Sequence, residues 1–271
     1  MNTNETIKEL YTKELYSMKR IANKLGISAY QVKKILLEEK VSLRTRAEQN
    51  NLTNQAKGKK VNHNYFDNID SNRKAWMLGF LAADGNIGQN RNSIKLSLSA
   101  IDTEILEKIK QEINIERDVK TSITNKGFEI SALAWSSANQ KIQLSKYGIV
   151  PNKTYKGTKL PRFVEDEEKQ MSFLLGYFDG DGCFKNDGKY CRIEICSYSS
   201  SILQDFSDLI ERKFSFKKDV YKDKQRVNYY TLTYSTQEAE TILDYLYKAN
   251  DLFLKRKKDK YFNWKIQNNR I

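Results

Sequence analysis

Two short apolar segments of this chain each end in an Asp-Gly pair whose carboxylates could act together. They are residues 77–85 (MLGFLAADG) and 174–182 (LLGYFDGDG), and their last aspartates, Asp84 and Asp181, lie 97 positions apart. Two carboxylates placed side by side repel each other unless a cation lies between them. Hard oxygen ligands with an incomplete shell suit Mg²⁺. The pair therefore predicts a divalent-metal site with Mg²⁺ as its cofactor.

Each segment is predicted to form a helix whose small residues share one face. Gly79 and Ala83 lie four residues apart, and Gly176 and Gly180 repeat that spacing, so each pair falls on one side of a helix. Glycine inside a helix costs about 0.5–1 kcal/mol relative to alanine, but small residues at this spacing let two helix backbones approach closely. We therefore expect the two helices to pack together and to bring the two aspartates side by side.

The ends of these helices are also predicted from residue type. Gly85 and Gly182 follow the aspartates, at the position where a glycine with left-handed backbone commonly ends a helix. Ser71 is expected to cap the start of the first helix. The alternative is two unrelated core helices, each capped by Asp-Gly, but the matching sequence around both copies argues against it.

Both halves of residues 71–271 predict the same order of elements. Strands are predicted at residues 93–100, 119–124, 128–135, 181–184, 190–197, 217–221 and 229–234. Helices are predicted at residues 102–112, 136–147, 200–213 and 236–248, with Asp102 as the cap of the first, before a last helix that contains Trp264. Residues 93–100 alternate apolar and polar side chains, which indicates a half-buried strand. The predicted fold class is α+β, with two pseudo-symmetric αββαββα repeats at residues 71–160 and 161–271.

The N-terminal part is predicted to be a separate helical module, residues 1–42. A helix at residues 17–25, a Gly-Ile-Ser turn and a helix at residues 29–37 resemble a helix-turn-helix. Its outer face would then present Tyr30, Gln31, Lys33 and Lys34 to DNA. The alternative is a three-helix bundle without DNA contact. Residues 43–70 are predicted to be a basic linker that either tracks phosphates, through Arg44 among others, or only tethers the module.

The composition favours a polyanionic partner. The chain has 271 residues and a formal net charge of +13, which most often indicates nucleic acid, although a soluble basic protein without such a partner is the alternative. The sequence contains no apolar stretch of about 18 residues, so no membrane span is expected. The polar N-terminus shows no signal peptide. We therefore expect a cytoplasmic protein of bacterial or phage origin, with an organelle as the alternative.

With these motifs, residues 71–265 resemble the LAGLIDADG homing endonucleases in their single-chain, two-motif form. The resemblance implies a monomer in which the motif helices form the central interface and two four-stranded antiparallel sheets form a saddle over DNA. It places Asp84 and Asp181 at the family's catalytic acidic position. It also implies that the backbone carbonyls of Ala83 and Gly180 hold metal.

The resemblance implies roles for further residues. Lys153 and Lys257 match basic residues that contact the cleavage-site phosphates or order water, and Asp102 and Ser199 occupy a more variable position near the site. Ala82 stands where the motif has its first aspartate, which the second copy keeps as Asp179. The DNA-contact candidates on the strand faces are Lys95, Ser97, Ser99, Arg192, Glu194, Thr231 and Thr233, and the phosphate candidates are Lys120, Lys218 and Lys222. Each of these could instead be only a solvated side chain.

The function implied by the resemblance is hydrolysis of one phosphodiester on each strand of a long, asymmetric double-stranded DNA site. Metal held by the two aspartates would polarise the phosphate and activate water, and the products would carry short 3′ overhangs. Two alternatives stay open. A DNA-binding regulator on the same fold would not cut, although such a protein has no physical reason to keep both acids. An RNA maturase would bind intron RNA through the same basic surface.

Overall fold

The protein is described here from a computed structural model, which covers residues 3–46, 48–49, 60–153, 159–161 and 166–270. The chain divides into two compact units, residues 1–60 and 61–271. The boundary lies inside the predicted linker, of which residues 50–59 are outside the described residues. Within the described ranges, no helix is both long and apolar enough to span a bilayer.

The first unit consists of helices α1 (Thr3–Thr12), α2 (Met18–Leu25) and α3 (Ala29–Glu38). Gly26 ends α2 with φ at 68°, a left-handed conformation that glycine adopts without strain. Ser28 then caps α3 in a capping box with Gln31. Both helices and the turn between them form where the sequence predicts them, while the helix-turn-helix assignment stays a prediction.

Arg44 closes this first unit instead of lying in an arm that tracks phosphates. Its guanidinium donates to the backbone carbonyls of Leu15 (3.1 Å), Tyr11 (2.9 Å) and Tyr16 (2.8 Å). It also lies 3.8 Å from the centroid of the Tyr11 ring, a cation–π contact. The phosphate-tracking interpretation is therefore wrong for Arg44, because its donors are already used inside the unit.

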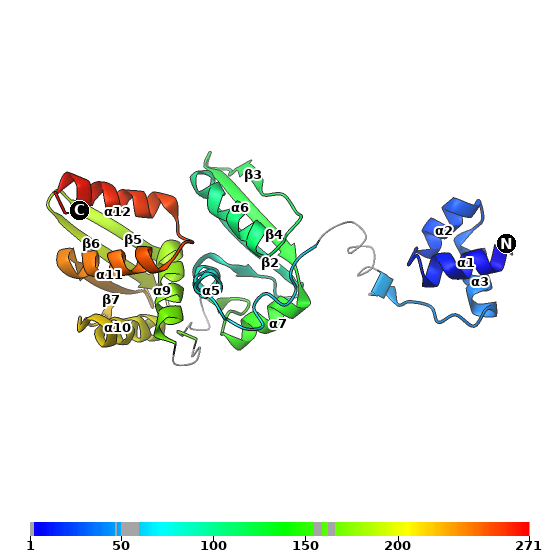
Figure 1. Cartoon of the computed structure of the whole chain (residues 1–271), viewed down its shortest axis with the longest axis horizontal. Coiled ribbons are helices and arrows are strands. Elements are labelled where there is room, and N and C mark those ends of the chain that lie inside the picture. The colour runs from blue at the N-terminus through cyan, green and yellow to red at the C-terminus, as the bar shows by residue number, and fades with distance from the viewer. Residues whose placement is uncertain (1–2, 47, 50–59, 154–158, 162–165, 271) are drawn as a thin grey trace. The chain divides into compact units, whose positions relative to one another are not determined.

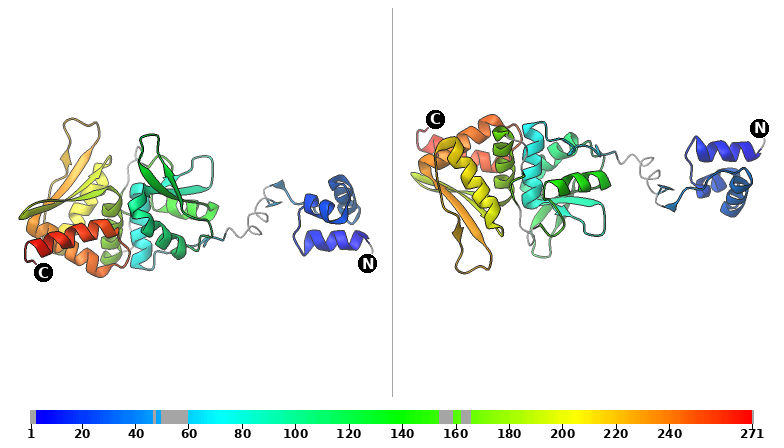
Figure 2. Two further views of the ribbon diagram at one scale, coloured as in Figure 1. Left: turned by 90° about the horizontal axis from the view of Figure 1, so that it is seen from above. Right: turned by 90° about the horizontal axis from the view of Figure 1, so that it is seen from below.

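The second unit is built from two similar halves that meet along helices α5 (Asn72–Asp84) and α9 (Glu167–Asp181), which lie side by side between the two sheets (Figures 1 and 2). The first sheet contains β1 (Asn86–Ile87), β2 (Ser93–Ser99), β4 (Glu129–Ser136) and β3 (Lys120–Ile123), in that order. The second contains β5 (Gly182–Asp187), β6 (Tyr190–Ser197), β8 (Tyr230–Ser235) and β7 (Tyr221–Lys222). Both sheets are antiparallel. The repeated strand order confirms the predicted pseudo-symmetric α+β fold.

Helices cover one face of each sheet and leave the other face open (Figure 2). The helices beyond the motif pair are α6 (Thr103–Glu112), α7 (Ala138–Lys146), α10 (Ser200–Phe214), α11 (Thr236–Ala249) and α12 (Lys255–Gln267). Strand β2 shows the consequence: Ile94, Leu96 and Leu98 are buried, and Lys95 and Ser97 between them are exposed. The predicted alternation is therefore confirmed.

Two sequence predictions in this unit are wrong. The strand predicted at residues 217–221 is only the two-residue β7, and Lys218 precedes it, where its ammonium lies 2.9 Å from Glu238 of α11. Lys218 therefore does not lie on a strand face. The linker prediction fails at Tyr65 and Phe66, which are 4% and 0% exposed in the core of the second unit. An aromatic pair in an otherwise polar segment is the signal that the linker interpretation ignored.

Candidate active site

The two motif helices pack backbone against backbone. A Cβ atom added to Gly79 would lie 2.0 Å from the carbonyl oxygen of Phe173, and one added to Gly176 would lie 1.9 Å from that of Trp76. A Cβ at Gly180 would lie 2.3 Å from the Cβ of Ala83 in the other helix. Side chains have no room at these positions, so the small residues are there because the helices cross so closely. The predicted contact between the two helices is confirmed.

The glycines that follow the aspartates end the two motif helices. Gly85 has φ −68° and Gly182 has φ −94°, both extended and not left-handed. A Cβ would lie 2.4 Å from the Leu81 carbonyl oxygen at Gly85, and 2.6 Å from that of Phe178 at Gly182. Both glycines end their helices as predicted, but with an extended and not a left-handed backbone. Glycine is needed because each chain turns directly from helix to strand against the last helical turn.

Asp84 and Asp181 are the last residues of α5 and α9, so the helix packing brings their carboxylates together. An atom at the Cβ position of Gly180 would lie 3.3 Å from Oδ2 of Asp84, which places that carboxylate against the opposite helix. Burial, and then the negative charge of Asp181, raise the pKa of Asp84 to about 6. Burial also raises the pKa of Asp181, although this residue keeps exposed surface. Raised pKa values on both acids indicate a site that favours an added cation.

Lys153 holds the end of α5 and also faces the acidic pair. Its ammonium donates to the backbone carbonyls of Ala83 (2.9 Å) and Gly85 (2.7 Å). The C-terminal end of a helix carries partial negative charge, so a cation is favourable there. Burial lowers the pKa of Lys153, and the nearby carboxylates, Asp181 first, counteract that effect.

Lys257 lies at the end of α9 and also donates to backbone carbonyls there. Its ammonium donates to the carbonyls of Phe178 (2.7 Å), Asp179 (2.7 Å) and Gly182 (2.6 Å). Burial lowers its pKa, and the carboxylates of Asp179 and Asp84 counteract that effect. The structure thus brings together the acids and lysines that the resemblance implied, with each lysine bonded to helix-end carbonyls.

The oxygen donors at this site fit a hard divalent cation. Within the described residues, no ion pair joins Asp84 or Asp181 to a basic side chain, because both lysines donate to carbonyls instead. In the same part of the chain no group of three or more His, Cys, Asp or Glu side chains could hold a metal ion. Two carboxylates would supply only part of the roughly six oxygens that Mg²⁺ requires, and water and phosphate would complete the shell.

The first aspartate of the motif, present only in the second copy, joins the two repeats. Asp179 is 1% exposed, and its Oδ2 accepts from Nε1 of Trp76 (2.9 Å) and from the backbone N–H of Leu254 (3.1 Å). At the symmetric place Ala82 lacks an acceptor, but Phe173, the counterpart of Trp76, lacks a donor. The departure of Ala82 from the motif is therefore matched by Phe173, which needs no acceptor.

A second asymmetry involves the weaker candidates Asp102 and Ser199. Asp102 makes no cap hydrogen bond to α6; its two oxygens instead accept from Nε of Arg256 in the other repeat, at 3.1 and 2.9 Å. The predicted cap is therefore wrong, because the carboxylate of Asp102 pairs with the guanidinium of Arg256 and not with a backbone N–H of α6. Ser199, at the symmetric position, donates its backbone N–H to Ser197 (3.0 Å) and lines a recess beside Asp181 together with Lys153.

The open faces of the two sheets carry the other predicted contact residues. On the first sheet, Lys95, Ser97, Ser99 and Lys120 are exposed. On the second, Arg192 and Lys222 are exposed, while Glu194, Thr231 and Thr233 are half-buried. Lys185 was missed: it lies opposite Arg192 in the β5–β6 register, and its ammonium donates to Glu194 at 2.8 and 3.0 Å. Extending the β5 alternation past Phe184 would have found it.

The predicted contact residues of the first unit lie on the outer face of α3. Tyr30 is 75% exposed, and Lys33 and Lys34 are also exposed. Gln31 differs, because its side-chain oxygen accepts from the backbone N–H of Ser28 (2.8 Å) in the capping box. Its oxygen is therefore committed to the helix start.

Comparison with known proteins agrees with this architecture. Residues 168–247, within the second repeat, match the model of the LAGLIDADG-like domain. No curated protein matches the sequence.

Similar solved structures include the I-LtrWI LAGLIDADG homing endonuclease bound to target DNA, with 14% identity and a TM-score of 0.49 over 77% of this chain and 91% of that one. Another is the LAGLIDADG meganuclease I-AabMI bound to uncleaved DNA, with 13% identity and a TM-score of 0.46 over 72% and 89%. The N-terminal LAGLIDADG domain of WhiA has 15% identity and a TM-score of 0.44 over 81% and 98%.

Proposed function

We propose that this protein is a site-specific, Mg²⁺-dependent DNA endonuclease that hydrolyses one phosphodiester on each strand and leaves 3′ overhangs. The observation that carries the proposal is the pair Asp84 and Asp181, placed together by helices that pack backbone against backbone. A core helix pair has no need of two acids at its end, where the helix dipoles already disfavour negative charge. A pair of acids that can hold a divalent cation suits hydrolysis of a phosphodiester.

The chemistry divides between the cation and the side chains. A divalent cation bound by Asp84 and Asp181 would polarise the phosphate and lower the pKa of the attacking water. The ammonium of Lys153, which lines the recess with Asp181, would offset charge that develops on the phosphate. The two acids must be ionised to bind the cation. The cleavage rate is therefore expected to decrease as the pH drops below about 6, the pKa of Asp84.

The surfaces around the acids fit double-stranded DNA. Arg192 and Lys185 on the second sheet and Lys95 on the first lie on open faces, and β-strand faces enter the major groove. The exposed Tyr30, Lys33 and Lys34 of α3 would extend the contact beyond the sheets. We propose a long asymmetric site bound by a monomer in the cytoplasm.

The test is Mg²⁺-dependent cutting of a randomised duplex library, with the double variant Asp84→Asn/Asp181→Asn as the control. Selective cutting by the wild-type protein alone is expected, and the recovered duplexes give the target. Tight, selective binding without cutting would favour the DNA-binding regulator instead. Binding to intron RNA, measured in parallel, would favour the maturase.

A further inference from the structure

We propose that the two active-site lysines do different jobs: Lys153 contacts the substrate phosphate or its attacking water, whereas Lys257 is a positioning residue that holds the end of α9. This inference rests on the proposed function and deepens it. It departs from the symmetric expectation, in which both lysines contact phosphate or order water.

The first argument is the number of donors each lysine has left. An ammonium group has three N–H donors. Lys257 donates to three backbone carbonyls, those of Phe178, Asp179 and Gly182, at 2.6–2.7 Å. All of its donors are therefore used inside the protein. Lys257 cannot bind a phosphate oxygen without giving up one of these bonds.

Lys153 makes fewer hydrogen bonds within the protein than Lys257 does. It donates to two carbonyls, those of Ala83 and Gly85, and no third acceptor is present among the described residues. It lines the recess that also contains Asp181, Tyr177 and Ser199. One N–H donor of Lys153 is therefore left for a phosphate oxygen or a water molecule in that recess.

The second argument is that the residues beside the two lysines differ. Arg256, the residue before Lys257, donates to Asp102, whose side chain is 4% exposed. The residues at the symmetric places are Asn152 and Ser199, which are shorter and carry no charge pair. The recess lined by Lys153 and Ser199 lies on the side that lacks this ion pair.

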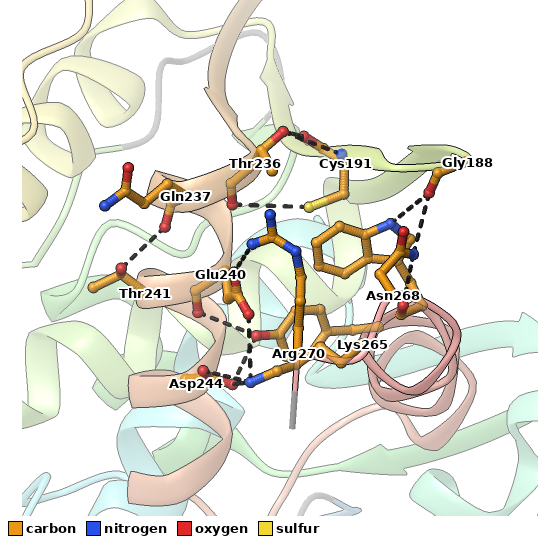
Figure 3. A network of polar contacts seen from close by, with 12 residues as sticks. Gly188, Cys191, Thr236, Gln237, Glu240, Thr241, Asp244, Lys265, Asn268 and Arg270 are labelled. Carbon is orange, nitrogen blue, oxygen red and sulfur yellow. Dashed lines mark hydrogen bonds and ion pairs between the residues drawn. The ribbon is translucent and has the colours of Figure 1, made fainter.

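The third argument is the rigid attachment of the helix that carries Lys257. Figure 3 shows α12 held to α11 and to the β5–β6 turn. Lys265 donates to Asp244 at 2.7 Å, and Arg270 pairs with Glu240 at 2.5 Å. Nε1 of Trp264 donates to the Gly188 carbonyl at 2.9 Å. These contacts attach the C-terminal part of α12, and at its first turn Lys257 joins the same helix to the end of α9.

The experiment compares Lys153→Met and Lys257→Met in the full chain, with Lys255→Met as a matched control. Lys255 is exposed at the start of the same helix. Thermal unfolding is measured first. We expect Lys257→Met to lower Tm by about 5 °C or more, because three hydrogen bonds from a buried ammonium are lost at the end of α9. We expect Lys153→Met to lower it by less than about 2 °C, since water in the recess can replace the ammonium, and the control to be unchanged.

Strand-resolved cleavage is measured next, well below each Tm, on the duplex recovered from the library with each strand labelled separately. Lys153→Met is expected to slow cleavage of one strand by about 100-fold and to leave the other within about threefold. Lys257→Met should slow both strands equally, because a displaced α9 end moves Asp181 against Asp84. Unchanged cleavage rates for Lys257→Met below its Tm would show that Lys257 does not position the acids, and would overturn the proposal.

Two further results would contradict these proposals. If Lys257→Met keeps its Tm and loses cleavage of a single strand, Lys257 contacts a phosphate and the division of roles is wrong. If the wild-type protein cuts no duplex at all, the proposed function fails. The Tm comparison then still tests the donor count independently of any activity.

Discussion

The two repeats share a backbone plan but present different surfaces. Both sheets have the same strand order, and both motif helices need glycine at the crossing. On the open faces the chemistry differs: Ser97 and Ala132 lie opposite each other on the first sheet, whereas Arg192, Glu194 and Lys185 cluster on the second. Packing fixes the shared plan because backbone contact leaves no alternative. The open faces are free to differ, because packing does not constrain them.

The interface between α5 and α9 contains both symmetric and asymmetric positions. Gly79 and Gly176 are equivalent, since each would place a Cβ within 2.0 Å of a carbonyl oxygen in the other helix. Trp76 and Asp179 form a hydrogen bond that has no counterpart in the pair Phe173 and Ala82. Symmetry is therefore required of the backbone and not of the side chains around it. The predictions below test this comparison.

The largest effect is expected at the symmetric glycines. Gly79→Ala or Gly176→Ala should each lower the free energy of unfolding by about 3 kcal/mol or more, because the helices must separate to admit the methyl group. Chemical denaturation monitored by circular dichroism measures this loss. The control is Gly127→Ala, in an exposed turn with φ 79° and open space around it, which should cost only about 1 kcal/mol. Equal losses in glycine and control variants would show that the crossing tolerates side chains.

The next effect concerns the asymmetric hydrogen bond. Trp76→Phe and Asp179→Ala should each cost about 2 kcal/mol, since each leaves a buried partner unsatisfied. The double variant reproduces the Phe173 and Ala82 pairing of the other side, so it should cost about 1–2 kcal/mol less than the sum of the two. A double-mutant cycle from denaturation curves measures this coupling. Strict additivity would mean that the bond contributes nothing.

The buried acid also makes stability depend on pH. Burial raises the pKa of Asp179 to about 7, from the ordinary 3.8. The folded state therefore binds more protons than the unfolded state between these values, and its stabilisation is lost as pH rises through about 7. Asp179→Asn should reduce the fall in unfolding free energy between pH 5 and 8 by on the order of 1–2 kcal/mol. Parallel pH profiles for the two proteins would contradict the raised pKa.

The smallest effect is expected for DNA affinity at the sheet faces. Arg192→Ala should weaken binding to the recovered duplex by about 1 kcal/mol or more, while Ser97→Ala should change it by less than about 0.5 kcal/mol. Fluorescence anisotropy at fixed salt measures both. Equal effects would show that the second face does not read DNA more strongly than the first.

Much of this architecture could be predicted from the sequence, because it follows from local patterns. The alternation of residues 93–99 specifies a strand, and the duplicated Gly-xxx-small spacing specifies the helix crossing. Predictions failed where a distant partner decides the outcome. Arg44 donates to backbone carbonyls of the first unit, and Asp102 accepts from Arg256 of the other repeat. Neither partner can be identified from neighbouring residues.

The residues of the candidate site also differ in whether the sequence alone predicts their role. The two acids could be located because the motif that carries them occurs twice. The donor count of Lys257 could not be predicted, since it depends on three carbonyls at the end of α9 that only the fold brings to it. Lys185 was accessible to sequence analysis, because it continues the alternation of β5.

The most direct test of the central claim is single-turnover cleavage of the recovered duplex by Asp84→Asn and Asp181→Asn, measured separately in Mg²⁺, with DNA affinity measured in parallel. We predict that each variant loses cleavage by about 1000-fold, equivalent to about 4 kcal/mol, and keeps affinity within about threefold. Retained cleavage in both single variants would contradict the assignment of the paired helix ends as the catalytic site.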